Sequence, residues 1–537
     1  MLRPTHVPAL HDSYRRAGLW RGETLADTFA ATAKRRPDAV AIVDGAVRLG
    51  FAELVARAER AAAGLARLGV GPGDAVAVQL PNWHETVVAY LAIARLGAVI
   101  TPVLPSHRER ELGFVLQASG ARVLLVPGVY RSCDHRALAA HVRGDAPALA
   151  QVVIVRGDVE DDGVAWNDVA ASTADLPTAP RDAEAVVLLL HTSGTTADPK
   201  GVLHSHETLL AEARSLGPVH GIGPDDVTLM PSPLAHVSGI VHAFLVPGVH
   251  GARAVLMDRW EPGGALELIA RERVTYMVGA PTFLRDLARH SDLATHDVSS
   301  FRLFSCGGAD VDPTLVRDAA DRLRCVAKRV YGSSEFPTIT TTGPDDPPAR
   351  RIDSAGRPIG AAELRLVDDD GALVPTGGEG EVQARGPECF LGYRDAAHGA
   401  DAFTADGWFR TGDLGVLDEG GFLRISGRKK DIIIRKGENI SAREVEDLIA
   451  THPAVVEVAV VGLPDPVAGE IACAMLRVEP GVAAPSLADV CAHLLARGLS
   501  KQKLPERLEV VDDFPRTASG KIVKRTLRDR LIREGAR

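Results

Sequence analysis

A run of hydroxyl side chains that ends in lysine is the first feature of this 537-residue chain able to support chemistry. Residues 191–201 read His-Thr-Ser-Gly-Thr-Thr-Ala-Asp-Pro-Lys-Gly and follow directly on the apolar run Val186–Leu190. Hydroxyl and ammonium groups donate hydrogen bonds to phosphate oxygens, and ligands of open α/β sheets bind where strands end in such loops. The competing interpretation is a Ser/Thr-rich surface turn, and the spacing of a Walker motif is missing. We expect a phosphate-binding loop of another type, formed by Thr192, Ser193, Gly194, Thr195, Thr196 and Lys200.

Four further stretches follow downstream. They are 331–335 (Tyr-Gly-Ser-Ser-Glu), 410–413 (Arg-Thr-Gly-Asp), 427–430 (Gly-Arg-Lys-Lys) and 515–521 (Pro-Arg-Thr-Ala-Ser-Gly-Lys). With the loop at 192–201, the set resembles the ordered motifs of the adenylate-forming enzymes, namely acyl-CoA synthetases, luciferases and non-ribosomal adenylation domains. The resemblance covers nearly the whole chain. It implies two steps: an acid and MgATP give acyl-AMP and pyrophosphate, and a nucleophile then takes the acyl group.

The resemblance implies a role for each motif. The loop hydroxyls and Lys200 would hold the β- and γ-phosphates, because this kind of transfer needs mainly positioning and charge neutralisation. Glu335 matches the Mg²⁺-binding glutamate. Asp413 matches the carboxylate that accepts the ribose hydroxyls, and Arg428 matches a partner of ribose and phosphate. Lys521 matches the catalytic lysine that bridges the attacking carboxylate and the α-phosphate. Around the adenine and the rest of the nucleotide we expect Tyr331, Gly332, Ser333, Ser334, Gly307, Gly308 and Ala309.

The acid site is expected around His236, which occupies the position of the family's gate between acid and nucleotide. A buried structural histidine is the alternative interpretation. The pocket candidates are His236, Gly279, Gly307 and Phe336. Their geometry, which sets the preference for one acid, cannot be read from the sequence.

The stretch 427–430 is expected to be an exposed connector, with the family's hinge at Lys430. Beyond it, Lys436 and Gly437 would line the tunnel through which the acceptor enters. Related CoA ligases often have two glycines there, so Lys436 is a departure. Two smaller departures are Ala197 in place of a phosphate-loop glycine and Ser334 where threonine is common.

Two functions remain open, and they differ in the acceptor of the acyl group. An acid–CoA ligase for an alicyclic, aryl or medium-chain acid fits the stretches around His236, Tyr331 and Arg410. Transfer to an amine or to a carrier-protein thiol is favoured by Lys436, which could block CoA or could instead contact its phosphates. A luciferase-like oxygenase has no feature in its favour. A non-catalytic scaffold conflicts with the presence of Lys521, Glu335 and Asp413 together, and no G-x-S-x-G hydrolase motif occurs.

Composition agrees with a globular enzyme. The chain is 46% hydrophobic and 24% charged, and its net charge of −9 argues against nucleic acid as the main partner. Six dispersed cysteines without a C-x-x-C pair favour a reducing compartment and no zinc site. The first residues contain no apolar segment of signal-peptide type, and no window is long enough to span a membrane. We expect a cytoplasmic protein.

The elements that must position these residues alternate between apolar runs and helical periodicity as far as residue 355. Such alternation predicts a largely parallel sheet covered by helices. Short alternating runs at 363–367, 380–384 and 421–425 then predict a small antiparallel β unit. The fold class is therefore α/β with an α+β C-terminal domain, which the resemblance implies to be mobile. The expected domains are 1–426 for adenylation, 427–430 as the hinge and 431–537 as the lid.

Overall fold

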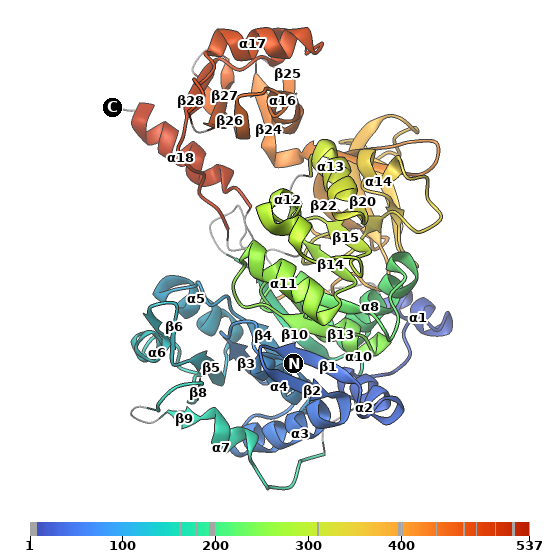
Figure 1. The fold of residues 1–537 in the computed structure, drawn as a ribbon, viewed down its shortest axis with the longest axis vertical. Coiled ribbons are helices and arrows are strands. Elements are labelled where there is room, and N and C mark those ends of the chain that lie inside the picture. The colour runs from blue at the N-terminus through green and yellow to red at the C-terminus, as the bar shows by residue number, and fades with distance from the viewer. Residues whose placement is uncertain are drawn as a thin grey trace. The chain divides into compact units, whose positions relative to one another are not determined.

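The computed structural model describes residues 8–159, 163–178, 181–192, 199–308, 311–395, 399, 401–435, 438–465, 468–479, 481–499, 501–517 and 521–535. The chain divides into two compact units (Figure 1). Unit 1 comprises residues 1–363 and 385–409, and unit 2 comprises residues 364–384 and 410–537. Each unit is described by itself below.

Unit 1 contains two large sheets. The first has nine strands in the order β18 (Arg357–Pro358), β17 (Thr340–Thr341), β16 (Val326–Tyr331), β15 (Leu303–Cys306), β14 (Tyr276–Gly279), β12 (Val227–Met230), β13 (Arg253–Leu256), β1 (Val40–Asp44) and β2 (Val47–Gly50). Its central neighbours, from β16 to β1, all pair in parallel. Met277, Phe304 and Leu229 on one face form a core with side chains of the helices α11 (Pro262–Glu272), α12 (Pro281–Arg289) and α13 (Pro313–Leu323). The prediction of a parallel sheet covered by helices is confirmed.

The second sheet of unit 1 has eight strands. Their order is β21 (Gly392–Tyr393), β11 (Lys200–Ser205), β10 (Val186–Thr192), β4 (Val99–Pro102), β3 (Ala75–Val78), β5 (Val123–Pro127), β8 (Gln151–Val155) and β9 (Val164–Ala165). From β10 to β9 the strands are parallel, whereas β11 and β21 extend the edge in antiparallel fashion. The strand expected at 186–190 is β10, and it carries the first residue of the phosphate loop.

The helices of unit 1 follow their apolar periodicity. Helix α3 (Phe51–Arg67) has apolar residues at three- and four-residue spacing, and Phe51, Leu54, Ala58, Ala62 and Leu65 are all buried. The other helices and short pairs of this unit are α1 (Pro8–Arg16), α2 (Leu25–Arg35), α4 (His84–Arg95), α5 (Glu109–Ser119), β6 (Val129–Tyr130), β7 (Cys133–Asp134), α6 (His135–Arg143), α7 (Trp166–Ala170), α8 (His206–His220), α9 (Val237–Gly239), the π-helix η1 (Ile240–Leu245), α10 (Val246–His250), η2 (Ser291–Thr295) and α14 (Arg350–Asp353).

Unit 2 begins with the small β unit that the alternating runs predict. This four-stranded sheet has the order β19 (Glu363–Val367), β20 (Glu379–Arg385), β22 (Phe409–Leu417) and β23 (Leu423–Arg428), and its outermost residues Glu363, Arg385 and Phe409 belong to unit 1. The α+β part follows as η3 (Lys429–Asp431), β24 (Ile432–Arg435), β25 (Glu438–Ser441), α16 (Ala442–Ile449), β26 (Val455–Asp465), β27 (Gly469–Val478), α17 (Leu487–Ala496), η4 (Lys501–Lys503), β28 (Arg507–Val510) and α18 (Lys524–Gly535).

The predicted connector is ordered where it leaves the small sheet. Gly427 is buried and Arg428 half-buried at the end of β23, so exposure begins only at Lys429. The Ser441 hydroxyl donates to the Ser426 carbonyl at 2.8 Å, which ties the end of this sheet to the start of α16. Lys430 lies in the single turn η3. The hinge there stays a prediction.

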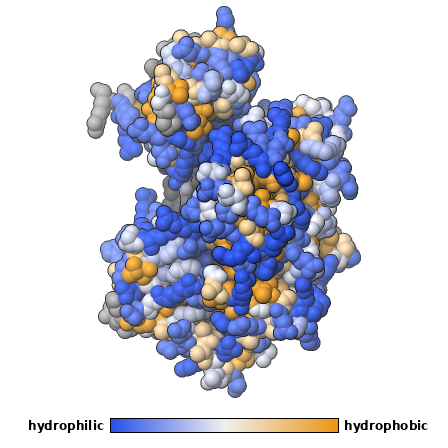
Figure 2. Space-filling model, in the orientation of Figure 1, coloured by the Kyte–Doolittle hydropathy of each residue, from blue (hydrophilic) through white to orange (hydrophobic). Residues whose placement is uncertain are grey.

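The surface shown in Figure 2 is mostly hydrophilic, with hydrophobic residues in small groups. Large apolar side chains that are exposed among the described residues, such as Val129 and Leu373, lie apart in the sequence. No helix in the described ranges is both long and apolar enough to cross a membrane.

Candidate active site

The phosphate loop is closed at its base by the hairpin of β10 and β11. Thr192 and Lys200 are cross-strand partners in this antiparallel pair, so the segment between them leaves and re-enters the sheet at one point. Ser193, Gly194, Thr195 and Thr196 lie outside the described residues. The two described members of the predicted loop, Thr192 and Lys200, therefore stand together at the end of a buried strand.

The 331–335 segment turns sharply after β16. The backbone N–H of Ser333 donates to the Phe336 carbonyl at 2.9 Å, and the hydroxyl of Ser333 accepts from the Glu335 N–H at 3.2 Å. A Cβ on Gly332 would lie 2.0 Å from the Pro337 carbonyl oxygen, so only glycine fits this turn. The carboxylate of Glu335 is half-buried.

His204 supports this turn from β11, although its sequence position carries no signal for that role. Its Nε2 donates to the Ser334 carbonyl at 2.8 Å, from 130 residues away in the chain. Burial lowers the pKa of His204 to about 4, although the hydrogen bond to this carbonyl opposes the shift. The ring is therefore neutral at pH 7, and the hydrogen bond fixes the proton on Nε2.

The expected adenine and acid pocket residues Gly279 and Gly307 end two neighbouring parallel strands. The N–H of Gly307 donates to the Gly279 carbonyl at 3.1 Å. Gly308 follows with a φ of +79° and nothing near the position of a Cβ, which leaves open space above the strand ends. Ala309 lies outside the described residues. Phe336 is fully buried, so its ring packs in the protein interior.

His236 is held by a hydrogen-bond network that sequence inspection does not detect. The side-chain oxygen of Asn82 accepts from the Leu234 N–H at 2.7 Å, and its amide donates to the Ser232 carbonyl at 2.9 Å. The Nδ1 of His236 accepts from the Ser238 N–H at 3.3 Å. Burial lowers the pKa of His236. The ring is thus a neutral imidazole with its proton on Nε2, ready to act as a donor.

Unit 2 places two expected nucleotide residues opposite each other. Asp413 on β22 and Arg428 on β23 are cross-strand partners. The Nε of Arg428 lies 2.8 Å from Oδ1 of Asp413, and the side chain of Asp413 is only 8% exposed. The hydroxyl of Thr411 accepts from the Asp413 N–H at 3.1 Å. The strand pairing therefore fixes both side chains before any ligand binds.

Lys521 lies at the end of a tight turn in the same unit. Its N–H donates to the Thr517 hydroxyl at 3.1 Å, and the Thr517 N–H donates to the Lys521 carbonyl at 2.8 Å. Ion pairs anchor both flanks: Arg516 with Glu457 at 2.7 Å, and Lys524 with Glu446 at 2.7 Å. The turn is fixed to the body of the α+β part.

The pKa of Lys521 depends in part on Asp413 and Arg428. Desolvation and, to a smaller extent, the nearby Arg428 lower the pKa of Lys521 to about 8. Asp413 and Asp431 oppose the shift. The side chain keeps an exposed surface, so solvent screens part of this effect. The structure thus brings three predicted residues of unit 2 into electrostatic reach of one another.

Two predicted residues of the acceptor tunnel, Lys436 and Gly437, lie outside the described residues. At Lys430 only the backbone is described. The hinge and the tunnel therefore remain predictions from sequence.

Two buried carboxyl groups flank the 331–338 segment and were not predicted. Glu212 of α8 accepts from the Thr338 N–H at 3.3 Å, and Glu388 accepts from the Ser215 hydroxyl at 2.6 Å. Burial raises the pKa of Glu212 to about 8 and that of Glu388 to about 7. The negative charge of Glu388 also raises the pKa of Glu212. The sequence feature that could have revealed the Glu212 carboxyl is its position among the buried apolar residues of α8.

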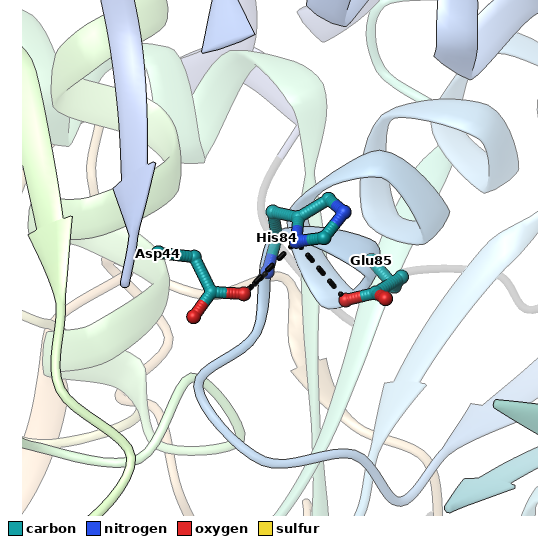
Figure 3. A group of neighbouring side chains, drawn as sticks. All are labelled: Asp44, His84 and Glu85. Carbon is teal, nitrogen blue, oxygen red and sulfur yellow. Dashed lines mark hydrogen bonds and ion pairs between the residues drawn. The ribbon is translucent and has the colours of Figure 1, made fainter. Parts of the chain in front are cut away.

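Figure 3 shows Asp44, His84 and Glu85, whose ligand atoms lie close enough together to hold a cation. Arg156 already occupies this position. Its Nη2 contacts Asp44 at 2.5 Å and Glu85 at 2.8 Å, and its guanidinium lies over the Trp83 ring at 4.2 Å. Burial would raise the pKa of Asp44, but hydrogen bonds from His84 and Arg156 outweigh it and the pKa is lowered. The cluster is a structural ion-pair network.

The donor set suits magnesium and a nucleotide. Glu335 offers a hard carboxylate oxygen, and Lys200 offers an ammonium group. In unit 2 the buried carboxylate of Asp413 suits a diol. Unit 1 by itself therefore offers groups that can neutralise phosphates, and unit 2 by itself offers a carboxylate that can accept hydrogen bonds from a sugar.

Comparisons with known proteins agree with this chemistry. Residues 29–394 match the AMP-binding enzyme family, and residues 444–521 match the C-terminal domain of AMP-binding enzymes. The medium-chain fatty-acid–CoA ligase of Escherichia coli (strain K12) is 36% identical over 97% of this chain and 93% of that protein. The salicylyl-CoA synthase / salicylate adenylyltransferase of a Streptomyces species is 38% identical over 96% of this chain and 95% of that protein.

Solved structures give the same result. ATP-bound MatB from Rhodopseudomonas palustris superposes with a TM-score of 0.85 at 30% identity, covering 94% of this chain and 99% of that one. The amide bond synthetase McbA from Marinactinospora thermotolerans superposes with a TM-score of 0.83 at 30% identity over the same shares of the two chains. This chain belongs to the family of AMP-binding, adenylate-forming enzymes.

Proposed function

We propose that this protein activates a carboxylic acid with MgATP and then transfers the acyl group to CoA. In the first step a carboxylate oxygen attacks the α-phosphorus, the bond to the β-phosphate oxygen breaks, and pyrophosphate leaves. In the second step the thiol sulfur of CoA attacks the acyl carbonyl, AMP leaves, and the thiol proton is released. The acid is an alicyclic, aryl or medium-chain acid. The observation that carries the proposal is the pairing of Asp413 with Arg428 in reach of Lys521.

Each residue has a task in the first step. Lys200 and the phosphate loop hold the β- and γ-phosphates, and Glu335 holds Mg²⁺, which neutralises phosphate charge when bound. Asp413 accepts hydrogen bonds from the two ribose hydroxyls, and Arg428 contacts ribose and phosphate. Lys521 donates to the attacking carboxylate and the α-phosphate as negative charge develops there.

The acid would enter beside His236. The neutral ring places an N–H at Nε2, which can donate to the carboxylate before attack and then move aside for the acceptor. Gly279 and Gly307, which end neighbouring strands, are the proposed backbone wall of the acid pocket. The reaction is placed in the cytoplasm, in agreement with six free cysteines.

A second acceptor has specific support. The likeness to the amide bond synthetase McbA and the lysine at position 436 both favour transfer of the acyl group to an amine. A carrier-protein thiol is the third acceptor in this class, and relatives include pyochelin synthase PchD of Pseudomonas aeruginosa. All three share the first step and differ only in the nucleophile.

A pyrophosphate-release screen of carboxylic acids tests the first step, and repeating it with CoA, hydroxylamine and amino acids separates the acceptors. Acid-dependent pyrophosphate release followed by a CoA thioester is the expected result. Acid-dependent release with an amide product and no thioester would replace CoA by an amine. No acid-dependent release from any acid would overturn the proposed function as a whole.

A further inference from the structure

Residues 390–394 form a short segment that connects the predicted metal ligand to the predicted phosphate lysine. The N–H of Phe390 donates to the Glu335 carbonyl at 2.7 Å, and the N–H of Leu391 donates to the Leu203 carbonyl at 2.8 Å. Strand β21 then pairs with β11, and the N–H of Arg394 donates to the Gly201 carbonyl at 2.7 Å. Backbone hydrogen bonds therefore hold the segment against both elements.

The side chain of Tyr393 contacts both functional groups. Its hydroxyl donates to Oε1 of Glu335 at 2.7 Å. The ammonium of Lys200 lies over the same ring, with Nζ at 4.7 Å from the ring centroid. The two contacts use different parts of the phenol: the hydroxyl edge for the carboxylate and the π face for the cation.

The ring itself is held firmly. Tyr393 is 7% exposed, and the Phe390 ring packs edge-on against it with the centroids 4.9 Å apart. Burial raises the pKa of Tyr393, and the negative charge of Glu335 raises it further. Burial and the contact with Phe390 therefore hold the ring in place.

We propose that Tyr393 is a positioning residue that fixes the Glu335 carboxylate for the metal ion and holds Lys200 toward the phosphates. By occupying Oε1, it leaves Oε2 of Glu335 for the metal. This inference rests on the proposed function, because it takes Glu335 as the metal ligand. Partners that orient a metal-binding side chain change metal affinity about 10- to 100-fold when they are removed.

The test compares two tyrosines that make the same kinds of contact: each hydroxyl donates to an oxygen, and a cation lies over each ring. Tyr393→Phe removes only the hydroxyl and keeps the ring beneath Lys200. Tyr130→Phe is the matched control, since the Tyr130 hydroxyl donates to the Asp258 carbonyl at 3.1 Å and Arg131 lies over its ring at 5.0 Å, away from the site. Binding of Mn²⁺ in the presence of ATP and absence of acid is followed by loss of the free-Mn²⁺ electron paramagnetic resonance signal, after subtraction of the loss caused by ATP alone in a protein-free titration.

Tyr393→Phe is expected to raise the Mn²⁺ concentration at half-saturation about tenfold or more, while Tyr130→Phe leaves it unchanged. In a Glu335→Gln background the same Tyr393→Phe change should have no further effect. An equal half-saturation for wild type and Tyr393→Phe would overturn the inference, and so would an undiminished effect in the Glu335→Gln background. If Tyr393→Phe fails to fold, Tyr393→Leu serves as the second variant, because it also removes the hydroxyl and introduces neither a metal ligand nor a hydrogen-bond donor.

Failure of the proposed function gives a different pattern. In that case wild type shows no acid-dependent pyrophosphate release, yet the shift in Mn²⁺ binding at Tyr393 is still measurable. Conversely, if wild type is active and Tyr393→Phe has the same half-saturation for Mn²⁺ as wild type, only the positioning role of Tyr393 is overturned.

Discussion

The ion pair between Asp413 and Arg428 spans two neighbouring strands, with Nε of Arg428 2.8 Å from Oδ1 of Asp413. The side chain of Asp413 is nearly buried, while the side chain of Arg428 is 37% exposed. The aspartate is thus oriented by the protein, and part of the Arg428 side chain is exposed to solvent.

Asp413→Asn is expected to weaken ATP binding about 10- to 100-fold. Hydrogen bonds to a charged group contribute about 1.5–3 kcal/mol each, and the amide replaces one acceptor oxygen with a donor. Isothermal titration with ATP measures the loss. The variant should also lose discrimination against 3′-deoxy-ATP. Unchanged discrimination would argue against a ribose role for Asp413.

Lys521→Ala is expected to lower acyl-AMP formation about 10²- to 10³-fold, since one preorganised donor at the developing charge is lost. Transfer from supplied acyl-AMP should be largely retained. The two half-reactions are measured separately by ATP–pyrophosphate exchange and by consumption of synthetic acyl-AMP. Lys503→Ala is a control, because Lys503 forms an ion pair with Glu444 at 2.7 Å in the same unit. Equal losses in both half-reactions would refute the assignment.

The rate of acyl-AMP formation should fall as the pH rises through about 8. Desolvation and Arg428 depress the pKa of Lys521 to about 8, and the ammonium must be charged to stabilise the transition state. Below that pH the lysine is protonated, so the rate is retained; above it the charge is lost. In Lys521→Arg the fall should move to higher pH, because guanidinium remains charged. A pH profile of pyrophosphate release tests this.

Lys430→Pro is expected to slow acyl transfer more than acyl-AMP formation. Proline fixes φ near −65° and so restricts the rotation that a hinge requires. Single-turnover kinetics of each half-reaction provide the measurement, and Lys429→Ala at the neighbouring position is the control. A transfer rate equal to that of wild type would contradict a hinge at this residue.

Glu212→Gln should make stability less dependent on pH. Burial raises the pKa of Glu212 from an ordinary 4.5 to about 8, so the folded protein favours the protonated form. Its contribution is fully present below about pH 4.5 and is lost as the pH rises toward 8, on the order of a few kcal/mol. Thermal unfolding at about pH 5.5 and about pH 8.5 should show a smaller difference for Glu212→Gln than for wild type. An unchanged difference would exclude this carboxyl as the cause.

Local patterns predicted much of the fold because they depend only on the spacing along the chain. The apolar spacing of α3 placed its buried face, and the alternation at 363–367 placed β19 to the residue. Lys200, Glu335 and Lys521 were recognisable for another reason: each lies in a short motif whose residues are consecutive. Phosphate binding by residues 193–196 and the place of Lys436 in the acceptor tunnel stay predictions.

The contacts that orient these groups were not predictable, because their partners are distant in the chain. Tyr393 reaches Glu335 across 58 residues, and Asn82 reaches Leu234 across 152. No periodicity or motif links such pairs. They meet because β21 is placed beside β11, and because the loop after β12 packs against the segment before α4.

The sequence by itself therefore identified the family and predicted the two-step chemistry and the reacting side chains. These follow from short motifs and local periodicity, which are properties of neighbouring residues. Only the tertiary structure decided that Asp413 is paired with Arg428, that the proton of His236 lies on Nε2, and that a tyrosine joins Glu335 to Lys200. Those features depend on which strands become neighbours, and strand order is set by the packing of the whole sheet.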